Sequence, residues 1–265
     1  MARLGKRGRG LPAAVAGLAV ALALAAACSS FDRSAFEPPR IEGAAFVGDQ
    51  ACQDCHPRIT RAFPQSAHAR LHPPGAGGRD HACESCHGPA EAHVASGGAG
   101  PDRHIVNPGR DPQACYQCHL EVSAEFHLPR HHPVTEEKMT CAACHDPHGL
   151  DIAKPAGGAM MARRNETCAG CHREQTRPFV FEHAAMREGC VSCHSPHGSI
   201  NAKLLTVRDS NLCLRCHAQV PGPGAAGGFY IGRVDHSGLL RYGTCWTAGC
   251  HAAIHGSNTQ PYYFY

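Results

Sequence analysis

The sequence is poor in large apolar side chains. Phe, Trp and Tyr together make up 6% of the 265 residues, and alternating strand patterns are scarce. Because aromatic side chains dominate the packing of ordinary cores, a conventional globular core is not expected. Gly (29) and Pro (20) are abundant instead, which favours loops and short elements.

A surplus of charge of one sign is also missing. Four of the 25 basic residues lie in the first nine positions, so the chain beyond residue 27 carries 21 basic and 22 acidic residues. Eighteen of those 21 are Arg and only three are Lys. This balance gives no support to nucleic-acid binding.

The N-terminus predicts export from the cytoplasm. Residues 1–27 have a basic start followed by an uncharged stretch rich in Ala and Leu, too short to favour a membrane-spanning helix. No two arginines are adjacent there, so a twin-arginine signal is not expected. Cys28 stands where a bacterial lipoprotein signal places its lipidated cysteine, although Ala25 replaces the usual Leu. The alternative is ordinary cleavage after Ala27, which would leave Cys28 as a free thiol.

Cysteine (17) and histidine (21) are strongly over-represented. Sixteen cysteines form eight pairs, each followed immediately by His. Seven pairs read Cys-x-x-Cys-His, and the eighth is stretched to Cys-x4-Cys-His. We number them as sites 1 to 8 along the chain: Cys52/Cys55/His56, Cys83/Cys86/His87, Cys115/Cys118/His119, Cys141/Cys144/His145, Cys168/Cys171/His172, Cys190/Cys193/His194, Cys213/Cys216/His217 and Cys245/Cys250/His251.

This spacing suits one chemistry. Two thiols one short turn apart can add to the two vinyl groups of a haem, and the adjacent His then binds the iron. Zinc knuckles and disulfides also use closely spaced cysteines, but neither requires His after every second Cys. The pattern predicts eight covalently bound haems c, each with its motif His as the proximal iron ligand.

Further histidines predict a second ligand for every iron. The sites fall into four two-haem units, each reading site, lone His, site, lone His. The mature chain has only four Met, too few to serve eight irons, so most haems are expected to be bis-His and of low potential. The eight lone histidines are His68, His93, His132, His148, His183, His197, His236 and His255.

Chain length constrains which iron each lone histidine can reach. Three residues span at most about 11 Å, too little to pass comfortably round a haem. His148 is therefore expected to bind a haem other than that of His145, and His197 one other than that of His194.

A choice between neighbouring histidines is settled by alignment. His131 competes with His132, and the residues after His132 align with those after His183, which favours His132. The other histidines are expected to be exposed or bonded to propionates; they are His72, His81, His104 and His127.

The expected fold class is a multihaem cytochrome c: mostly irregular, with short α-helices and little β structure, built around a chain of eight haems. Helical runs are expected near residues 113–122, 165–174, 182–188 and 204–214. The predicted organisation is an export signal (1–27), a tether (28–48), an octahaem domain (49–255) and an aromatic C-terminal tail (257–265), which either packs on the last haem or anchors a partner. The four dihaem units are predicted at 49–100, 108–150, 163–200 and 208–256.

The chain resembles the periplasmic decahaem cytochromes of bacterial respiration, both the electron conduits plugged through outer-membrane porins and the relatives that feed sulfoxide reductases. Two Pro-His-Gly segments, at 147–149 and 196–198, belong to the resemblance, which covers most of residues 48–220. The chain differs from that family because it has eight sites rather than ten and because its last motif is stretched. The other matching segments are residues 48–52, 66–70, 83–89 with His93, 131–134, 179–183, 187–190 and 212–217.

The resemblance implies electron transfer from a periplasmic donor towards the outer membrane or a terminal reductase. It also implies distal iron ligands at His68, His93, His132, His148, His183 and His197. Expected partners are other cytochromes or a quinol-linked donor and an outer-membrane porin, with a lipid tether at Cys28 and a location in the periplasm or outer membrane of a Gram-negative bacterium.

Two other functions compete with that of an electron carrier. A multihaem reductase needs an iron with a vacant position, and the stretched site 8 is the only irregular motif; no Cys-x-x-Cys-Lys motif occurs. An extracellular cytochrome filament would use the aromatic tail or an unpaired His as its contact between subunits.

Overall fold

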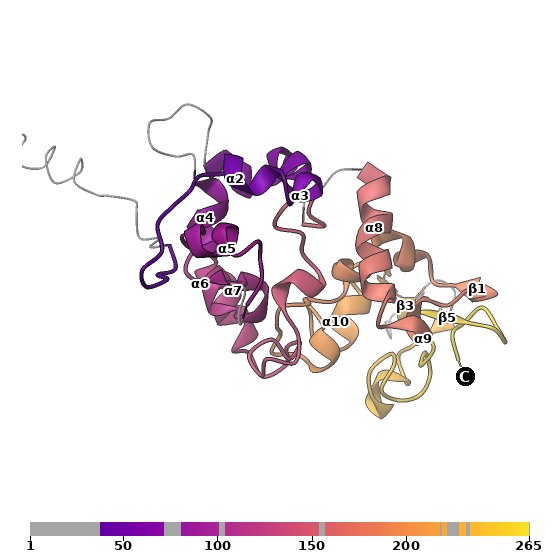
Figure 1. Ribbon diagram of the computed structural model, residues 1–265. Helices are drawn as coiled ribbons and strands as arrows, with labels where there is room; N and C mark the ends of the chain where they lie inside the picture. Colours follow the sequence, from indigo (N-terminus) through magenta and orange to yellow (C-terminus); the bar gives the residue numbers. More distant parts are fainter. Residues whose placement is uncertain are drawn as a thin grey trace, which may run out of the picture. The chain divides into compact units, whose positions relative to one another are not determined.

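The computed structural model describes residues 38–71, 81–100, 104–153, 157–217, 219–221, 228–231 and 234–264 (Figure 1). All described residues belong to one unit, Pro38–Tyr265. The predicted export signal, Cys28 and the first ten residues of the predicted tether lie outside them, as does His72. Within the described residues, no helix combines the length and apolarity that a membrane crossing requires.

Short helices separated by turns make up most of the regular structure. The longest has 13 residues and the others have four to seven. They are α2 (Gln50–Gln53), α3 (Pro57–Ala62), α4 (Ala82–His87), α5 (Glu91–Ala95), α6 (Gln113–Tyr116), α7 (Leu120–Phe126), α8 (Gly157–Ala169), α9 (Arg173–Thr176) and α10 (Ser210–Cys213).

The motif histidines explain why several helices are short. His56, His119 and His172 have ψ angles of 47–56°, outside the helical region, and each directly precedes a new helix. The chain therefore turns at the first motif of units 1, 2 and 3, between α2 and α3, α6 and α7, and α8 and α9. A continuous helix across 113–122 or 165–174 is not formed, although helical residues occupy most of both ranges.

The other expected helical ranges are also only partly helical. Residues 182–188 contain the 3₁₀ helix η6 (Ala184–Glu188), and 204–214 contains α10. Further 3₁₀ turns occur through the described chain, at η1 (Phe63–Gln65), η2 (His68–Leu71), η4 (Pro108–Arg110), η5 (Cys141–Ala143), η7 (Cys190–Ser192), η8 (Ala202–Leu204) and η9 (Leu240–Tyr242).

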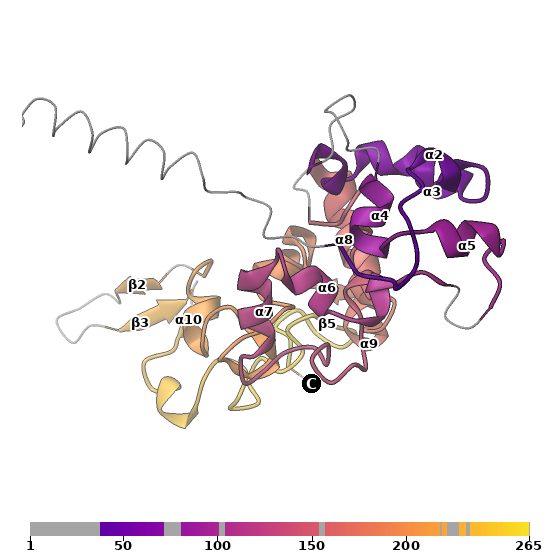
Figure 2. The same ribbon diagram turned by 60° about the vertical axis from the view of Figure 1, so that its left-hand side comes forward.

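Strands are few and short. β1 (Phe181–Glu182) pairs antiparallel with β5 (Gly256–Ser257), which joins the third unit to the end of the fourth. β2 (Gln219–Pro221), β3 (Phe229–Ile231) and β4 (Val234–Asp235) form a small antiparallel sheet in that order, and β2 and β3 lie side by side in Figure 2. The predicted fold class, with short helices, little β structure and mostly irregular chain, is confirmed.

The apolar core made by the protein itself is small. Tyr116, Phe126 and Val134 are buried together, and Val122 and Met139 pack against them. This cluster lies within the second unit and is the one core cluster found in the described residues. Its size agrees with the low aromatic content, and it leaves most of the apolar bulk to be supplied by bound groups.

Part of the predicted tether is held against the second motif. The Glu84 carboxylate accepts hydrogen bonds from the backbone N–H groups of Val47 and Gly48, at 2.8–3.2 Å, and from that of Ala90 at 2.8 Å. Glu84 is 1% exposed. The last two residues of the predicted tether, Val47 and Gly48, therefore contact the predicted octahaem domain.

Candidate haem sites

Each motif closes as one turn that presents its histidine. The His N–H donates to the carbonyl of the first cysteine at 2.9–3.0 Å in sites 1, 3, 4, 5, 6 and 7. The stretched site 8 closes in the same way, because His251 N–H donates to Cys245 O at 3.0 Å although two extra residues intervene. The longer loop therefore preserves the relation between the first cysteine and the histidine.

The motif cysteines carry free thiols. All sixteen are unpaired, so none forms a disulfide. In the described part of the chain, no group of three or more His, Cys, Asp or Glu is arranged to hold a metal ion by itself. The arrangement does not fit a zinc site, which needs four such ligands around one point.

Thiols of the two motifs in a unit contact each other. Hydrogen bonds join Cys52 with Cys83 and Cys115 with Cys141. The bond from Cys115 lowers the pKa of Cys141 to about 6, despite the opposing effect of burial. The same contact recurs in the third and fourth units, between the first cysteines of the two motifs: Cys168 with Cys190, and Cys213 with Cys245.

Successive units also meet through their motifs. Burial is the largest cause that raises the pKa of Cys86, and the charge of Cys118 in the next unit is the second. Burial likewise raises the pKa of Cys144 most, and the charge of Cys171 in the next unit comes second. Cys193 likewise raises the pKa of Cys213, as a smaller contribution after burial and Cys245. The attachment points of sites 1 to 8 therefore follow one another in space in chain order.

The second cysteine of a motif is generally more exposed than the first. All eight first cysteines are partly buried, whereas the second cysteines are exposed at every site except site 6. The contact between the two motifs of a unit explains the difference, because it covers only the first cysteine of each.

Cys55 and Cys216 differ from the other motif cysteines in their surroundings. Both thiols are exposed, and no hydrogen bond or charge contact joins either thiol to another predicted site residue in the described chain. They are the second cysteines of the first motif in units 1 and 4, the first and last of the four units. Unit 1 has no preceding unit to cover Cys55, and the contact between units 3 and 4 reaches Cys213 instead of Cys216. Haem attachment at these two thiols stays a prediction, as it does at the other fourteen, and here only the motif spacing supports it.

A polar residue three positions before the first cysteine ties the two motifs of a unit together. The Asp49 carboxylate accepts from the backbone N–H of Ala82 (3.0 Å) and Cys83 (2.9 Å). Asn165 Oδ1 accepts from Cys190 N–H at 3.2 Å. In the fourth unit Ser210 Oγ accepts from Cys245 N–H at 3.3 Å. Unit 2 has Pro112 at this position and lacks the bond. The role of this position was not predicted from the sequence, although the constant spacing of three residues before the first cysteine was visible there.

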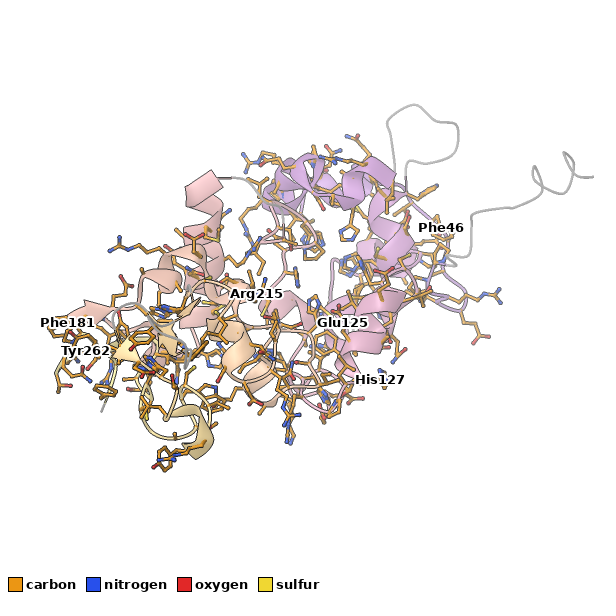
Figure 3. All side chains as sticks on the ribbon, turned by 180° about the vertical axis from the view of Figure 1, so that it is seen from behind. Phe46, Glu125, His127, Phe181, Arg215 and Tyr262 are labelled. Carbon is orange, nitrogen blue, oxygen red and sulfur yellow. The ribbon has the colours of Figure 1, made fainter. Side chains whose placement is uncertain are left out.

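Seven of the eight motif histidines face a lone histidine at nearly constant distance. The ring centroids lie 5.9–6.3 Å apart in every pair, and the side chains are drawn in Figure 3. Four pairs are nearly parallel, with interplanar angles of 13–18°. In site order, the pairs are His56–His93, His87–His148, His119–His68, His145–His197, His172–His132, His194–His255 and His217–His183.

This spacing fits one metal ion between two imidazoles. Two metal–nitrogen bonds of about 2 Å each, with roughly 1 Å from each Nε2 to its own ring centre, give about 6 Å between centroids. Aromatic pairs in direct contact scatter over about 4.5–7 Å. A range of 0.4 Å over seven pairs, each containing one motif His, therefore fits a shared coordination geometry better than side-chain stacking. The residues present fit a haem iron at each of these positions.

Hydrogen bonds orient the rings for coordination. A ligating imidazole usually donates its other N–H to an oxygen, which leaves one nitrogen for the metal. The Nδ1 atoms of His87, His194 and His251 lie 2.7–2.9 Å from backbone carbonyl oxygens. Those of His145 and His197 lie at carboxylates instead.

A repeated contact links one lone histidine to the segment of another. His68 Nδ1 donates to the carbonyl of Pro147 at 3.3 Å, directly before His148. His132 Nδ1 donates to Pro196 O at 2.6 Å, directly before His197. His183 makes the equivalent bond to Ile254, directly before His255. Each bond joins consecutive units, and the first two are to carbonyls of the Pro-His-Gly segments.

Burial favours the neutral, coordinating form of three lone histidines. It is the largest cause that lowers the pKa of His148, His183 and His255 below the usual value, and the partner motif histidine adds to the effect in each case. A neutral imidazole is the form that binds a metal ion.

The pairing of histidines follows a simple rule. The first lone His of a unit faces the first motif His of the next unit, and the second lone His faces the second motif His of the preceding unit. The first unit has no predecessor, and its His93 faces His56 of the same unit. His148 and His197 accordingly face His87 and His145, not the motif histidines three residues before them.

Site 8 differs from the others. The ring facing His251 is that of Phe264 in the C-terminal tail, with the centroids 5.2 Å apart and an interplanar angle of 18°. The Nδ1 atom of His251 donates to Tyr262 O. His236 donates from Nδ1 to Val234 O at 2.9 Å and makes no ring contact with a motif His in the described chain. His236 and His251 are thus the lone and motif histidines left over by the pairing rule.

The other histidines have different surroundings. Both ring nitrogens of His131 are engaged, by Leu128 O at 2.6 Å and Glu136 Oε1 at 2.9 Å. His81 bonds Glu84, and His127, labelled in Figure 3, bonds Ser123 O. None of these three faces a motif histidine in the described chain.

The chain matches the family model described as a doubled CXXCH motif. The match covers residues 131–177 and 183–222, which include sites 4 to 7.

Among known proteins, the chain is similar to the multiheme cytochrome MtrA of Shewanella baltica, with 32% identity over 219 residues. It is also similar to the C-type polyheme cytochrome OmcB of Geobacter sulfurreducens (27% over 232 residues) and to the cytochrome c-type protein NrfH of Wolinella succinogenes (28% over 125 residues). These alignments cover 79%, 76% and 42% of the chain, respectively. The chain spans 58% of the length of the first relative, 29% of the second and 68% of the third.

Proposed function

Because the chain is a multihaem c-type cytochrome of the MtrA type, we propose that it binds eight haems c and conducts electrons along them. The observation that carries this proposal is the set of seven histidine pairs at 5.9–6.3 Å, each with a motif His on one side. Haems supply the redox chemistry when bound; the protein attaches them through paired cysteines, clamps each iron with imidazoles and holds consecutive sites together.

The proposed ligands are the eight motif histidines and the eight lone ones. For sites 1 to 7 each motif His is matched with the lone His that faces it. For site 8 the leftover His236 is the proposed partner of His251, by analogy with the first unit, where the terminal site is served from its own unit. Phe264 then packs on His251 without replacing a ligand.

Close succession of the sites supports conduction. The contacts between motif cysteines run from site 1 to site 8 without a gap in chain order. Six-coordinate irons have no vacant position for a substrate, so the proposed role is that of an electron carrier and not of an enzyme. The two neighbours of each interior site are its proposed electron donor and acceptor.

The proposed setting is anaerobic or extracellular respiration. Similarity to MtrA and OmcB and the predicted export signal support a place in the periplasm or at the outer membrane, with other cytochromes or a quinol-linked donor and an outer-membrane porin as partners. A lipid anchor at Cys28 is also part of the proposal.

A reductase with one open iron is the second candidate, and the irregular surroundings of His251 favour site 8 as its location. Electron paramagnetic resonance of the fully oxidised protein separates the two. The carrier is expected to give low-spin ferric signals only. A high-spin signal equal to one iron per protein would contradict it and support the reductase.

A further inference from the structure

Resting on the ligand pairs proposed above, we propose that Glu125 and Asp151 are positioning residues that lower the reduction potential of the iron at site 4 below those of sites 3 and 5. Both imidazoles assigned to this iron have a carboxylate at Nδ1. Asp151 Oδ1 and Oδ2 each lie 3.0 Å from His145 Nδ1, and Glu125 Oε2 lies 2.8 Å from His197 Nδ1.

Neighbouring sites have different partners. At site 3 His68 bonds the carbonyl of Pro147, and at site 5 His132 bonds that of Pro196. Neither His119 nor His172 makes a side-chain bond to a carboxylate in the described chain. No other of the seven pairs there has carboxylates on both rings. Site 4 therefore differs from its two neighbours in charge as well as in hydrogen bonding.

The carboxylates are held in place by the fold. Glu125, labelled in Figure 3, is on the last turn of α7. The next residue, Phe126, packs on His197 with ring centroids 5.3 Å apart. A Cβ on Gly198 would overlap the carbonyl of Glu125, so glycine permits the close approach of the His197 segment to this turn. Asp151 also accepts the N–H groups of Asp146 (3.0 Å) and Ala153 (2.7 Å).

Within the described residues, neither carboxylate has a cationic Lys or Arg side chain at ion-pair distance. Among the ion pairs of the described residues, none joins a Lys or Arg to Glu125 or Asp151; their partners are the two imidazoles. The Asp151 side chain is only 17% exposed, so water screens its charge incompletely. The Glu125 side chain is 45% exposed and more strongly screened, so its influence on the iron acts through the hydrogen bond to His197.

The electronic consequence follows from ligand basicity. A carboxylate that accepts a hydrogen bond from the Nδ1–H group makes an imidazole more electron-rich, which stabilises the ferric iron relative to the ferrous iron. The step concerned is one electron passing from the reduced iron of an adjacent site to the ferric iron of site 4, with no bond made or broken. Because the reduction potential of site 4 is lower than that of both neighbours, electron transfer into site 4 is energetically unfavourable and electron transfer out of it is favourable. Site 4 would then set the rate of passage between the two halves of the chain.

A spectroelectrochemical titration of the full-length holoprotein tests this. Glu125→Gln keeps an oxygen acceptor but removes the charge. We expect one of the eight haems to titrate at higher potential, with its reduced-to-oxidised ratio raised about tenfold at a fixed applied potential, or ~59 mV for a one-electron couple. Glu125→Asp, which keeps the charge, is expected to restore most of the wild-type titration. Asp151→Asn should shift the same haem in the same direction.

Glu121→Gln is the matched control. It removes the same charge from the exposed face of α7, without a contact to an imidazole, and should leave the titration unchanged. The proposal is overturned if Glu125→Gln and wild type titrate identically while the ferric spectra stay low-spin. A His197→Ala variant that keeps eight low-spin irons would instead show that the ligand pairing itself is wrong.

Discussion

At the residue scale, histidines that look alike in the sequence have different roles. His132 faces the motif histidine His172 and bonds Pro196 O through Nδ1, which leaves Nε2 for iron, whereas His131 has both ring nitrogens bonded to protein oxygens. That contrast agrees with the preference for His132 as the ligand, which was predicted from alignment. Ligand identity itself stays a prediction until the irons are examined.

Removing one lone histidine should open one iron. In His148→Ala the iron at site 2 loses the imidazole that faces His87 at 6.0 Å. We expect a high-spin ferric signal equal to one iron per protein and binding of one carbon monoxide after reduction. His127→Ala is the control, because His127 bonds only Ser123 O and faces no motif histidine in the described chain. Equal behaviour of the two variants would contradict the assignment.

At the element scale, spacing in the sequence predicted the motifs but not their partners. The offset from Cys to His is set by covalent attachment to one rigid ring, so it can be read locally. The pairing of His148 with His87 depends on how distant turns pack, and the Glu125–His197 bond joins residues 72 positions apart. Helix bounds were missed for a related reason, because His119 and His172 interrupt runs that otherwise have helical character.

The Glu84 carboxylate joins the segment before site 1 to α4. Burial raises the pKa of Glu84, but hydrogen bonds from the N–H groups of Val47, Ala90 and Gly48 and from His81 outweigh it and hold the pKa below the usual 4.5. A carboxyl with a lowered pKa in the folded state stabilises the fold above its unfolded pKa. That stability is lost as the pH falls through the folded value.

Glu84→Gln should therefore destabilise the holoprotein at neutral pH by about 1–3 kcal/mol, with the difference from wild type shrinking as the pH falls below about 4.5. Urea unfolding of the holoprotein, followed by circular dichroism at several pH values, measures this. Glu91→Gln removes the charge from a carboxylate that accepts one exposed bond from Ala45 N–H; it serves as the control and should change little. A pH-independent difference for Glu84→Gln would argue against a charge effect.

At the scale of the whole molecule, folding and haem attachment are expected to be one event. The described chain has few buried apolar residues, and its one core cluster centres on Tyr116, Phe126 and Val134. The sequence shortage of aromatics predicted this correctly. The bound rings would supply the missing apolar volume, and binding free energy would then count as folding free energy.

Protein made without haem attachment should consequently lack a cooperative fold. We expect flat thermal unfolding curves and rapid proteolysis of the apoprotein, in contrast to a cooperative transition for the holoprotein. Circular dichroism and limited proteolysis on both forms make the comparison. An apoprotein that unfolds cooperatively at a similar temperature would show that the polypeptide carries its own core.

The central claim is that eight haems are attached through the sixteen paired cysteines, including the exposed Cys55 and Cys216 and the two cysteines of the stretched site. The most direct measurement is the intact mass of the purified holoprotein, with peptide mapping of the attachment points. The account predicts eight haem additions per chain, one of them on Cys245 and Cys250. Seven or fewer in fully matured protein, or unmodified thiols at site 8, would contradict it.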